Sequence, residues 1–466
     1  MRLAPLVAVG LAASTLSAQP TRPFGTLREQ ADRQQRWLEQ RLTTVLPVLM
    51  RKHGIDMWVV PMREYNEDPV FTSLVSPTTF AARRRTIYVF FDRCAASNTP
   101  VDRPMPSIES GATESCVERI ALGGTSQGGL YEAVRSTTAA ASAGVRGQQA
   151  ELWGDQQWQV LKDVVEKRNP KVIGVDVSRT FAFSDGLSAG ELDGMSEALG
   201  SKWTARFKHA ESLPLEVIST RLPDEEVFFT ELTKLVHSLI GRMFSNEVIK
   251  PGVTRTSDVV WWWRQQVNDL GLGTWFQPSI EVQRRGSAEL GDDPVIQRGD
   301  VLHCDVGITA MRLNTDTQHD AYVLRDGETD VPAGLKKALV NSNRFQDILM
   351  EEARPGRTGN EVLRAVLGKL KSEGLNGTMY SHPIGMHGHG AGPLIGLWDY
   401  QDGVPGRGDA KIIPGMWFSS ELQVTTPVPE WSNQPVRMAQ EEDFFVGADG
   451  KNRWAFKRQS ELHIIR

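Results

Sequence analysis

Five side chains that commonly bind metal ions occur in order through the last third of the chain. They are Asp305, Asp316, His382, Glu421 and Glu441. Four carboxylates and one imidazole can hold two divalent ions with a hydroxide between them. Ligands of this kind suit Mn, Co, Zn or Fe, and the absence of a thiolate argues against a structural zinc site. The set therefore predicts a hydrolase with a two-metal centre.

The elements that must position the first two ligands are expected to be strands. Asp305 lies inside the apolar stretch 301–307, where a carboxylate is costly unless something neutralises it. Asp316 follows the turn-prone stretch 307–314. Two antiparallel strands would bring the two carboxylates together, and they would repel each other unless a cation lay between them.

The sequence around all five residues resembles that of the pita-bread metallopeptidases, a family that includes methionine aminopeptidase, prolidase and aminopeptidase P. Three motifs carry the resemblance. They are Asp-x-Gly at 305–307 followed by Asp316, His-x-x-Gly-x-x-x-His at 382–389, and Pro-Gly-Met at 414–416 leading to Glu421. The resemblance covers about residues 223–450.

The resemblance implies a role for each residue. Asp305 would chelate one metal ion, Asp316 and Glu441 would bridge two, and His382 and Glu421 would complete the shells. Glu421 would also shuttle a proton, and His389 would contact the substrate. The other register, with His389 as the ligand, leaves no His at the downstream position, so His382 is the preferred ligand.

The last ligand is either Glu441 or Glu442. The run 441–446 overlays on the Glu-Asp-Asp strand of the family, in which an Arg precedes the Glu by two positions. Here Arg437 precedes Glu441 by four positions. An even offset keeps two strand residues on one face, which favours Glu441, although a β-bulge could reverse this.

The chain also departs from the family pattern. The substrate-contacting His expected about twenty residues before the first Asp is missing from 281–286, and 317–320 lacks the Arg that follows the second Asp. His303, His319 or His387 could substitute, but a strand or loop histidine more often has a structural partner. These departures concern substrate choice more than metal binding.

Composition indicates a soluble, globular protein of two domains. The chain has 466 residues, of which 40% are hydrophobic and 23% charged, with a net charge of −5. This balance offers no broad basic field for nucleic acid. After the N-terminus, no apolar stretch approaches the roughly 20 residues that a membrane-spanning helix needs.

The N-terminus resembles a cleavable signal peptide over residues 1–18. Arg2 precedes the apolar segment 3–16, and small residues follow at 17–18. A buried first helix would show a similar pattern, but the change to polar residues at 19–23 favours a signal peptide and therefore a secreted or periplasmic protein.

Cys94 and Cys116 bracket a polar loop, and a disulfide between them is preferred over two unrelated thiols.

Two domains are expected, an α/β domain over 24–215 and an α+β domain over 223–466. Strands are predicted at 55–60, 86–91 and 171–175 in the first domain, with helices at 27–51 and 153–167. In the second, helices are predicted at 223–246, 257–270, 334–352 and 360–371. The helix at 257–270 carries Trp261, Trp262 and Trp263, which cannot all face one way, so at least one should meet another domain or subunit. The resemblance makes these a creatinase-type N-terminal domain and a pita-bread catalytic domain.

The resemblance implies an exported Xaa-Pro aminopeptidase that acts on peptides with proline at the second position. It also implies a homo-oligomer, a dimer, and two divalent ions, Mn first among them. The alternatives are an Xaa-Pro dipeptidase (prolidase), a creatinase-like hydrolase that is not a peptidase, and a binding module of the same fold.

Overall fold

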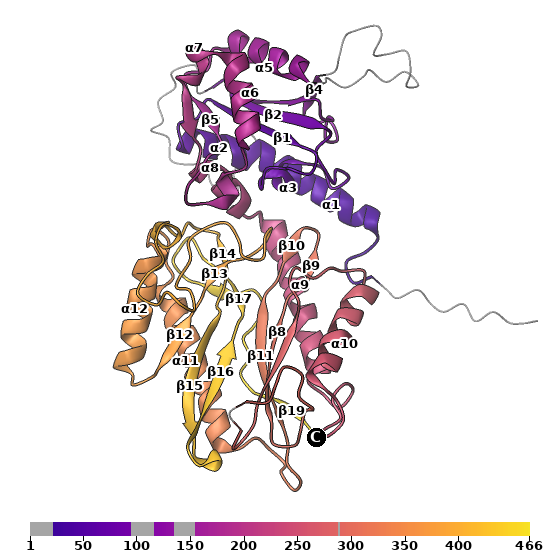
Figure 1. Ribbon diagram of the computed structural model, residues 1–466, viewed down its shortest axis with the longest axis vertical. Helices are drawn as coiled ribbons and strands as arrows, with labels where there is room; N and C mark the ends of the chain where they lie inside the picture. Colours follow the sequence, from indigo (N-terminus) through magenta and orange to yellow (C-terminus); the bar gives the residue numbers. More distant parts are fainter. Residues whose placement is uncertain (1–21, 95–115, 135–153, 288) are drawn as a thin grey trace, which may run out of the picture.

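The structure, a computed structural model, describes residues 22–94, 116–134, 154–287 and 289–466. They form an N-terminal part and a C-terminal part, drawn one above the other in Figure 1. Within the described residues, no helix has the length and apolar character needed to cross a membrane. The predicted signal peptide, residues 1–18, lies outside the described residues.

The N-terminal part is built on a six-stranded mixed sheet in the order β4-β3-β2-β1-β5-β6. Its strands are β1 (Met57–Arg63), β2 (Arg85–Asp92), β3 (Val117–Leu122), β4 (Glu132–Val134), β5 (Ile173–Val175) and β6 (Phe207–His209). The central β1 pairs antiparallel with β2 and parallel with β5. The three strands predicted in this domain are confirmed, with their ends shifted by a few residues.

Helices cover both faces of this sheet because its central strands are apolar on both sides. Trp58 and Phe90 pack towards α1 (Leu27–Gln40) and α2 (Leu46–Lys52), which a π-helical turn joins into one rod. The alternate residue Val59 packs towards the opposite helices. Those are α5 (Asp155–Arg168), α6 (Ala189–Leu199) and the short α7 (Ser201–Thr204). The helices predicted at 27–51 and 153–167 are confirmed.

The predicted disulfide is also confirmed. Cys94 and Cys116 are bonded, with their Cα atoms 5.7 Å apart. The polar loop that they bracket lies outside the described residues.

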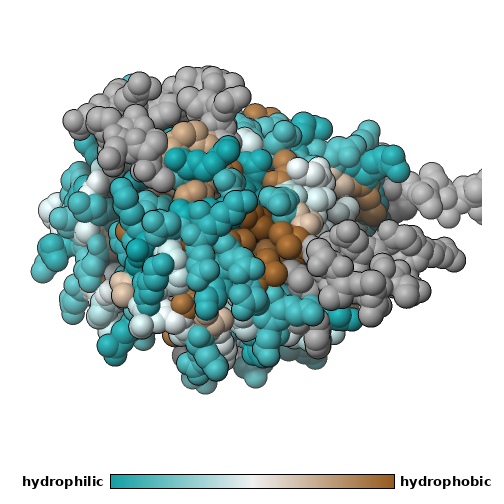
Figure 2. Space-filling view, turned by 90° about the horizontal axis from the view of Figure 1, so that it is seen from above, coloured by the Kyte–Doolittle hydropathy of each residue, from teal (hydrophilic) through white to brown (hydrophobic). Residues whose placement is uncertain are grey.

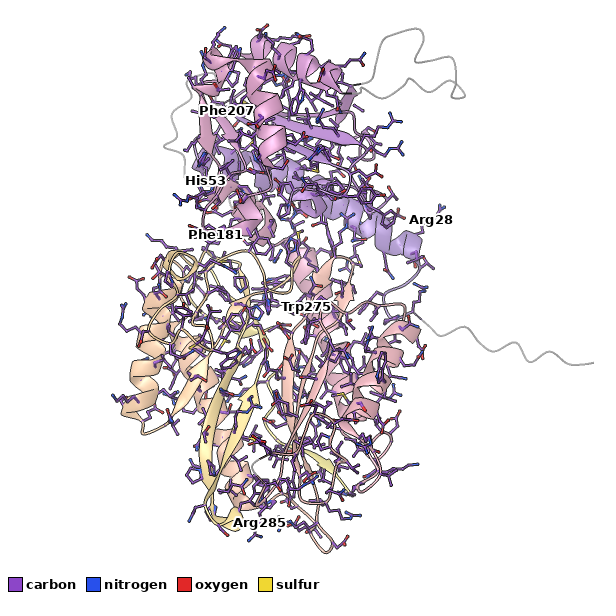
Figure 3. The ribbon with its side chains drawn as sticks, in the orientation of Figure 1. Arg28, His53, Phe181, Phe207, Trp275 and Arg285 are labelled. Carbon is purple, nitrogen blue, oxygen red and sulfur yellow. A yellow bond between two sulfur atoms is a disulfide. The ribbon has the colours of Figure 1, made fainter. Side chains whose placement is uncertain are left out.

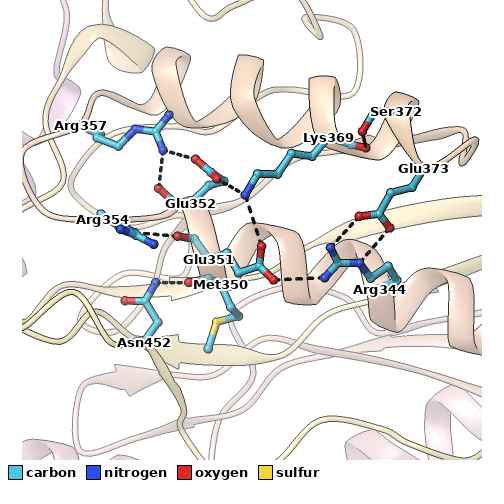
Figure 4. A network of polar contacts seen from close by, with 10 residues as sticks. All are labelled: Arg344, Met350, Glu351, Glu352, Arg354, Arg357, Lys369, Ser372, Glu373 and Asn452. Carbon is cyan, nitrogen blue, oxygen red and sulfur yellow. Dashed lines mark hydrogen bonds and ion pairs between the residues drawn. The ribbon is translucent and has the colours of Figure 1, made fainter.

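The C-terminal part has strands at its centre and a pair of helices on either side (Figure 1). The helices are α9 (Pro223–Met243) and α10 (Thr256–Asp269) on one side, and α11 (Ala333–Glu352) and α12 (Gly359–Ser372) on the other. All four coincide with predicted helices. Arg344 on α11 and Lys369 on α12 contribute to a network of exposed ion pairs that ties the second pair together (Figure 4).

Three sheets and a short hairpin form the centre. One sheet contains β7 (Ser279–Gln283), β8 (Val301–Val306), β11 (Thr317–Val323) and β19 (His463–Ile465). A second contains β12 (Gly377–Met379), β15 (Leu422–Val428) and β16 (Gln434–Gln440). The third contains β13 (His382–Pro383), β14 (Trp417–Ser419), β17 (Asp443–Phe445) and β18 (Arg453–Trp454). The hairpin is β9 (Thr309–Ala310) with β10 (Leu313–Asn314).

The two parts are joined by a buried ion pair at the start of α9. Pro223 and three acidic residues open this helix, as expected for the dipole-positive end. The Arg41 guanidinium, on the helical rod of the N-terminal part, lies 2.7 Å from Glu225 and also donates to the carbonyl oxygens of Val217 and Thr220. Both charged side chains are buried, so each depends on the other for its charge balance.

A second junction comes from the β9–β10 hairpin. Its Arg312 reaches into the N-terminal part and donates hydrogen bonds of 2.8–3.3 Å to four backbone carbonyl oxygens. They belong to Thr72, Val75, Ser76 and Thr79. These residues lie in and after α3 (Phe71–Leu74). The hairpin therefore connects the N-terminal part to β8, which carries Asp305, and to the segment before β11, which carries Asp316.

The three adjacent tryptophans of α10 lie in three different environments. Trp263 is fully buried and Trp262 is half-buried against the core, whereas Trp261 is 61% exposed. Elsewhere, the top of the N-terminal part is mostly hydrophilic with an apolar strip near its middle (Figure 2). The prediction that at least one tryptophan of this trio meets another domain or subunit stays a prediction.

We expect the Arg312→Ala variant to be destabilised because four carbonyl oxygens lose a charged donor. Hydrogen bonds to charged groups are worth about 1.5–3 kcal/mol each, so the free energy of unfolding should fall by at least that amount. Denaturant unfolding measures it. Arg364→Ala, which removes an exposed arginine of α12, should change it by less than about 0.5 kcal/mol. Equal values for both variants would contradict the junction described here.

Candidate metal centre

The five predicted ligands come from different elements and converge at the meeting point of the three sheets. Asp305 lies on β8, Asp316 precedes β11, His382 begins β13, Glu421 precedes β15 and Glu441 follows β16. The imidazole Nε2 of His382 lies 3.6 Å from Asp316 Oδ2, 3.5 Å from Glu441 Oε1 and 3.9 Å from Glu421 Oε2. Asp305 lies beside Asp316 and is influenced by the charge of Glu441. The chain therefore gathers all five side chains in one place.

The electrostatics of this cluster are unfavourable without a cation. Burial, and then the charge of Glu441, raise the pKa of Asp305 to about 7. The same two causes raise the pKa of Asp316 well above its usual value and that of Glu421 to about 10. Asp443 was not predicted, yet it also lies here and accepts a hydrogen bond from the backbone N–H of Asp316 at 3.2 Å. Burial and Glu441 raise its pKa too.

The orientation of the donor atoms fits divalent cations. The buried atoms Asp305 Oδ1, Asp316 Oδ1 and His382 Nε2 have no hydrogen-bond partner among the residues that the structure describes. His382 Nδ1 lies 3.0 Å from the carbonyl oxygen of Pro383, so Nδ1 carries the hydrogen and the lone pair of Nε2 faces the carboxylates. Unpartnered oxygens and a free imidazole lone pair, directed at one another, are the arrangement that a bound metal ion requires.

His389 lies beside this cluster and is exposed to solvent. Its ring centroid is 4.8 Å from that of His382 and 5.1 Å from that of Trp275. Figure 3 shows Trp275 at the top of the C-terminal part, below the N-terminal part. Burial of part of the ring, and then His382, lower the pKa of His389 to about 4, so the ring is neutral at neutral pH. An accessible neutral imidazole can donate a hydrogen bond to a bound molecule.

Glu441 and Glu442 face opposite sides, as the strand periodicity predicts. The Glu441 carboxylate accepts hydrogen bonds from Ser419 at 2.5 Å and from Gln318 at 2.8 Å, within the cluster of acids. The Glu442 carboxylate accepts instead from the Nε2 atoms of His237 and His319, both at 2.9 Å. Glu442 is therefore directed away from the candidate metal centre.

The partners of Glu442 form a buried cluster between α9 and β11. His319 Nδ1 lies 3.0 Å from His463 Nε2, and the backbone N–H of Gln459 donates to Glu442 at 2.8 Å. Burial opposes ionisation of Glu442, but His237 and His319 outweigh it and hold its pKa at about 2. The group is an ionised carboxylate held by three donors.

The other histidines considered from the sequence also have structural contacts. His319 lies in the cluster around Glu442, and the ring of His387 packs at 4.8 Å from Phe183 of the N-terminal part. His303 Nε2 lies 3.0 Å from Gln318 Oε1. Arg437 contacts Glu281 and Gln423.

Gln318, which contacts both Glu421 and Glu441, was not predicted from the sequence, although its position two residues after Asp316 placed it on the same strand face.

Comparison with known proteins gives a family match over part of the chain. Residues 231–448 match the profile described as Metallopeptidase family M24. Sequence comparison with curated proteins finds no match. The C-terminal part is a peptidase M24 domain, and the enzyme class of the chain is that of a metallopeptidase, a hydrolase.

Comparison of structures extends the similarity to the whole chain. An X-Pro aminopeptidase from Thermotoga maritima superposes with a TM-score of 0.57 at 15% identity, covering 89% of this chain and 99% of that one. An Xaa-Pro dipeptidase from Bacillus anthracis gives 0.53 at 16% identity, covering 93% and 99%. A variant of Escherichia coli aminopeptidase P gives 0.53 at 12% identity, covering 93% and 97%. The fold is therefore the predicted one, with a pita-bread domain after a smaller α/β domain.

Removing bound metal should destabilise the protein in a pH-dependent way. A carboxyl whose pKa is higher in the folded state than in the unfolded state, near 4, destabilises the fold as pH rises towards the folded value, about 7 for Asp305. Bound cations remove this penalty. The difference in Tm between metal-loaded and chelator-treated protein should therefore grow from pH 4 to pH 7, as measured by thermal unfolding. A difference that stays constant or shrinks over this range would contradict the arrangement.

The two neighbouring glutamates should respond differently to removal of their charge. Glu441→Gln should lower metal content, measured by elemental analysis. Glu442→Gln should retain metal but lose about 1.5–3 kcal/mol of unfolding free energy, because a charged acceptor of three hydrogen bonds is lost. The reverse pattern, with metal lost only in Glu442→Gln, would contradict the assigned faces of this strand.

Proposed function

We propose that the protein is an exported Xaa-Pro aminopeptidase that removes the N-terminal residue from peptides with proline at the second position. The observation that carries the proposal is the accessible, neutral His389 directly beside a buried cluster of carboxylates and His382. The similarity in fold to an X-Pro aminopeptidase over 89% of the chain supports it. Export rests on the signal-like sequence of residues 1–18, and a homo-dimer is part of the same proposal.

In this proposal Asp305, Asp316, His382, Glu421 and Glu441 hold two divalent ions, with Mn the first choice. When bound, the ions would lower the pKa of water and polarise the carbonyl of the scissile bond. The set of donors, four carboxylates and one imidazole, suits such ions.

The side chains of the protein supply the remaining steps. Glu421 accepts the proton from the attacking water and delivers it to the leaving nitrogen of proline. One of its oxygens, Oε1, is held by Gln318, and Oε2 faces His382. His389 donates a hydrogen bond to the oxygen that gains charge, or to the leaving group.

An Xaa-Pro dipeptidase is the second candidate, favoured by the similarity to the Bacillus anthracis enzyme of that name. Hydrolysis of an Xaa-Pro dipeptide and of a longer Xaa-Pro peptide, each with Mn, separates the two. Cleavage of the longer peptide before proline supports the aminopeptidase, and cleavage of the dipeptide alone supports the dipeptidase. If both peptides stay intact and elemental analysis finds no bound metal, a metal-free creatinase-like hydrolase or a binding module of the same fold would replace the proposal.

We expect His389→Ala to keep its metal ions but to lose catalytic rate, because only a contact that strengthens in the transition state is removed. Loss of one such donor typically lowers kcat by about 100- to 1,000-fold. His382→Ala should lose metal and activity together. His209→Ala, which removes an exposed histidine of β6, should leave both unchanged. Loss of metal in His389→Ala with retention in His382→Ala would reverse the assignment of the two histidines.

A further inference from the structure

We propose that Gln318 is a positioning residue of the metal centre, which its side-chain amide prepares by fixing the carboxylates of Glu421 and Glu441. The inference rests on the metal centre of the proposed function. It concerns how this chain orients its ligands, by means of a neutral side chain that contacts two of them.

The backbone places Gln318 at the middle of the site. In β11 it pairs with Asp305 of β8, and a pair of backbone hydrogen bonds, 3.0 and 3.1 Å, links it to Glu441. Side chains at directly paired positions of neighbouring strands point to the same face. The side chain of Gln318 is buried, and it lies between those of Asp305 and Glu441.

The amide group forms three of the four hydrogen bonds that it can make. A glutamine amide has two N–H donors on nitrogen and one acceptor oxygen. Gln318 Nε2 donates to Glu421 Oε1 and to Glu441 Oε2, both at 2.8 Å. Gln318 Oε1 lies 3.0 Å from Nε2 of the buried His303. Because the amide oxygen can only accept, His303 must donate, and this sets the amide orientation.

The reverse orientation is unfavourable. It would direct the amide oxygen at two carboxylates and an amide N–H at the donor of His303. His303 Nδ1 lies 3.6 Å from Glu281, beyond hydrogen-bond distance, and Glu281 pairs with Arg437. A chain of contacts therefore runs from the exposed edge of β7 to two predicted ligands.

The geometry selects which carboxylate oxygens face the other ligands. With Oε1 of Glu421 occupied, its Oε2 is directed towards His382, at 3.9 Å. With Oε2 of Glu441 occupied, its Oε1 lies 3.5 Å from His382. A lysine or arginine at position 318 would also donate hydrogen bonds, but its positive charge would offset that of the carboxylates. An amide orients both and leaves their negative charge available to a cation.

The test is the affinity of the full-length protein for Mn²⁺, measured by competition with a chelator. Groups that hydrogen-bond to metal ligands typically contribute about 10- to 100-fold to metal affinity or activity. We expect Gln318→Leu, which keeps the volume but removes the amide, to bind Mn²⁺ about 10- to 100-fold more weakly. Its kcat should fall by a similar factor, with KM within about twofold of wild type. Gln318→Asn, which is too short to reach both carboxylates, should show an intermediate loss and serves if the Leu variant does not fold.

The matched control is Gln157→Leu, a buried glutamine of α5 whose amide donates to the backbone carbonyl oxygens of Arg85 and Leu122 in the N-terminal part. It should retain wild-type Mn²⁺ affinity. His303→Ala should weaken binding, and the His303→Ala/Gln318→Leu double variant should be no weaker than Gln318→Leu, because His303 acts through Gln318. Mn²⁺ affinity within twofold of wild type in Gln318→Leu, or an additive double variant, would overturn the inference. Wild-type protein that binds Mn²⁺ but cleaves no Xaa-Pro peptide would overturn the proposed function alone.

Discussion

The mutual repulsion of buried carboxylates is the constraint on which the rest of the C-terminal part depends. Asp305, Asp316, Glu421, Glu441 and Asp443 come from three sheets and are brought within reach of one another in the interior. Transfer of one ionised carboxylate from water to an apolar interior is already costly, and several together are more so. The fold withstands this because each carboxylate is attached to a hydrogen-bonded strand or its end. Cations bound between the carboxylates would offset this repulsion, and the release of that repulsion would favour their binding.

Because side chains alternate along a strand, neighbouring residues are directed to opposite faces, one towards the candidate metal centre and the other towards the cluster around Glu442. Gln318 and Glu441 are directed at the candidate metal centre, whereas the next residues, His319 and Glu442, meet on the other side against α9. A shift of one residue in either strand would exchange the two sets. The cluster around Glu442 therefore does more than balance a buried charge, because it also helps to fix the register of the strands. It resists such a shift, because each histidine has a partner only in the present register.

Much of the fold and part of the candidate metal centre were predictable from short-range patterns in the sequence. Helical periodicity located the helices of both domains. The even offset between Arg437 and Glu441 predicted the side to which the Glu441 side chain is directed, although Arg437 itself contacts Glu281 and Gln423. The contacts of Gln318, His303 and Asp443 were not predictable, because their partners lie far away in the chain and no local pattern marks them. The same holds for the contacts of Arg312.

The β9–β10 hairpin has a further consequence. Arg312 is bonded to the N-terminal part, and four residues later the same backbone carries Asp316. Between them, Asn314 is anchored to the carbonyl oxygens of Gly385 and Met386, close to His382 in the chain. A rotation of the N-terminal part that displaces Arg312 would therefore also strain the two segments that present Asp316 and His382. Domain orientation and cation affinity are then linked equilibria, so a molecule wedged between the two parts and an ion bound below them would each alter the binding of the other by the same free energy.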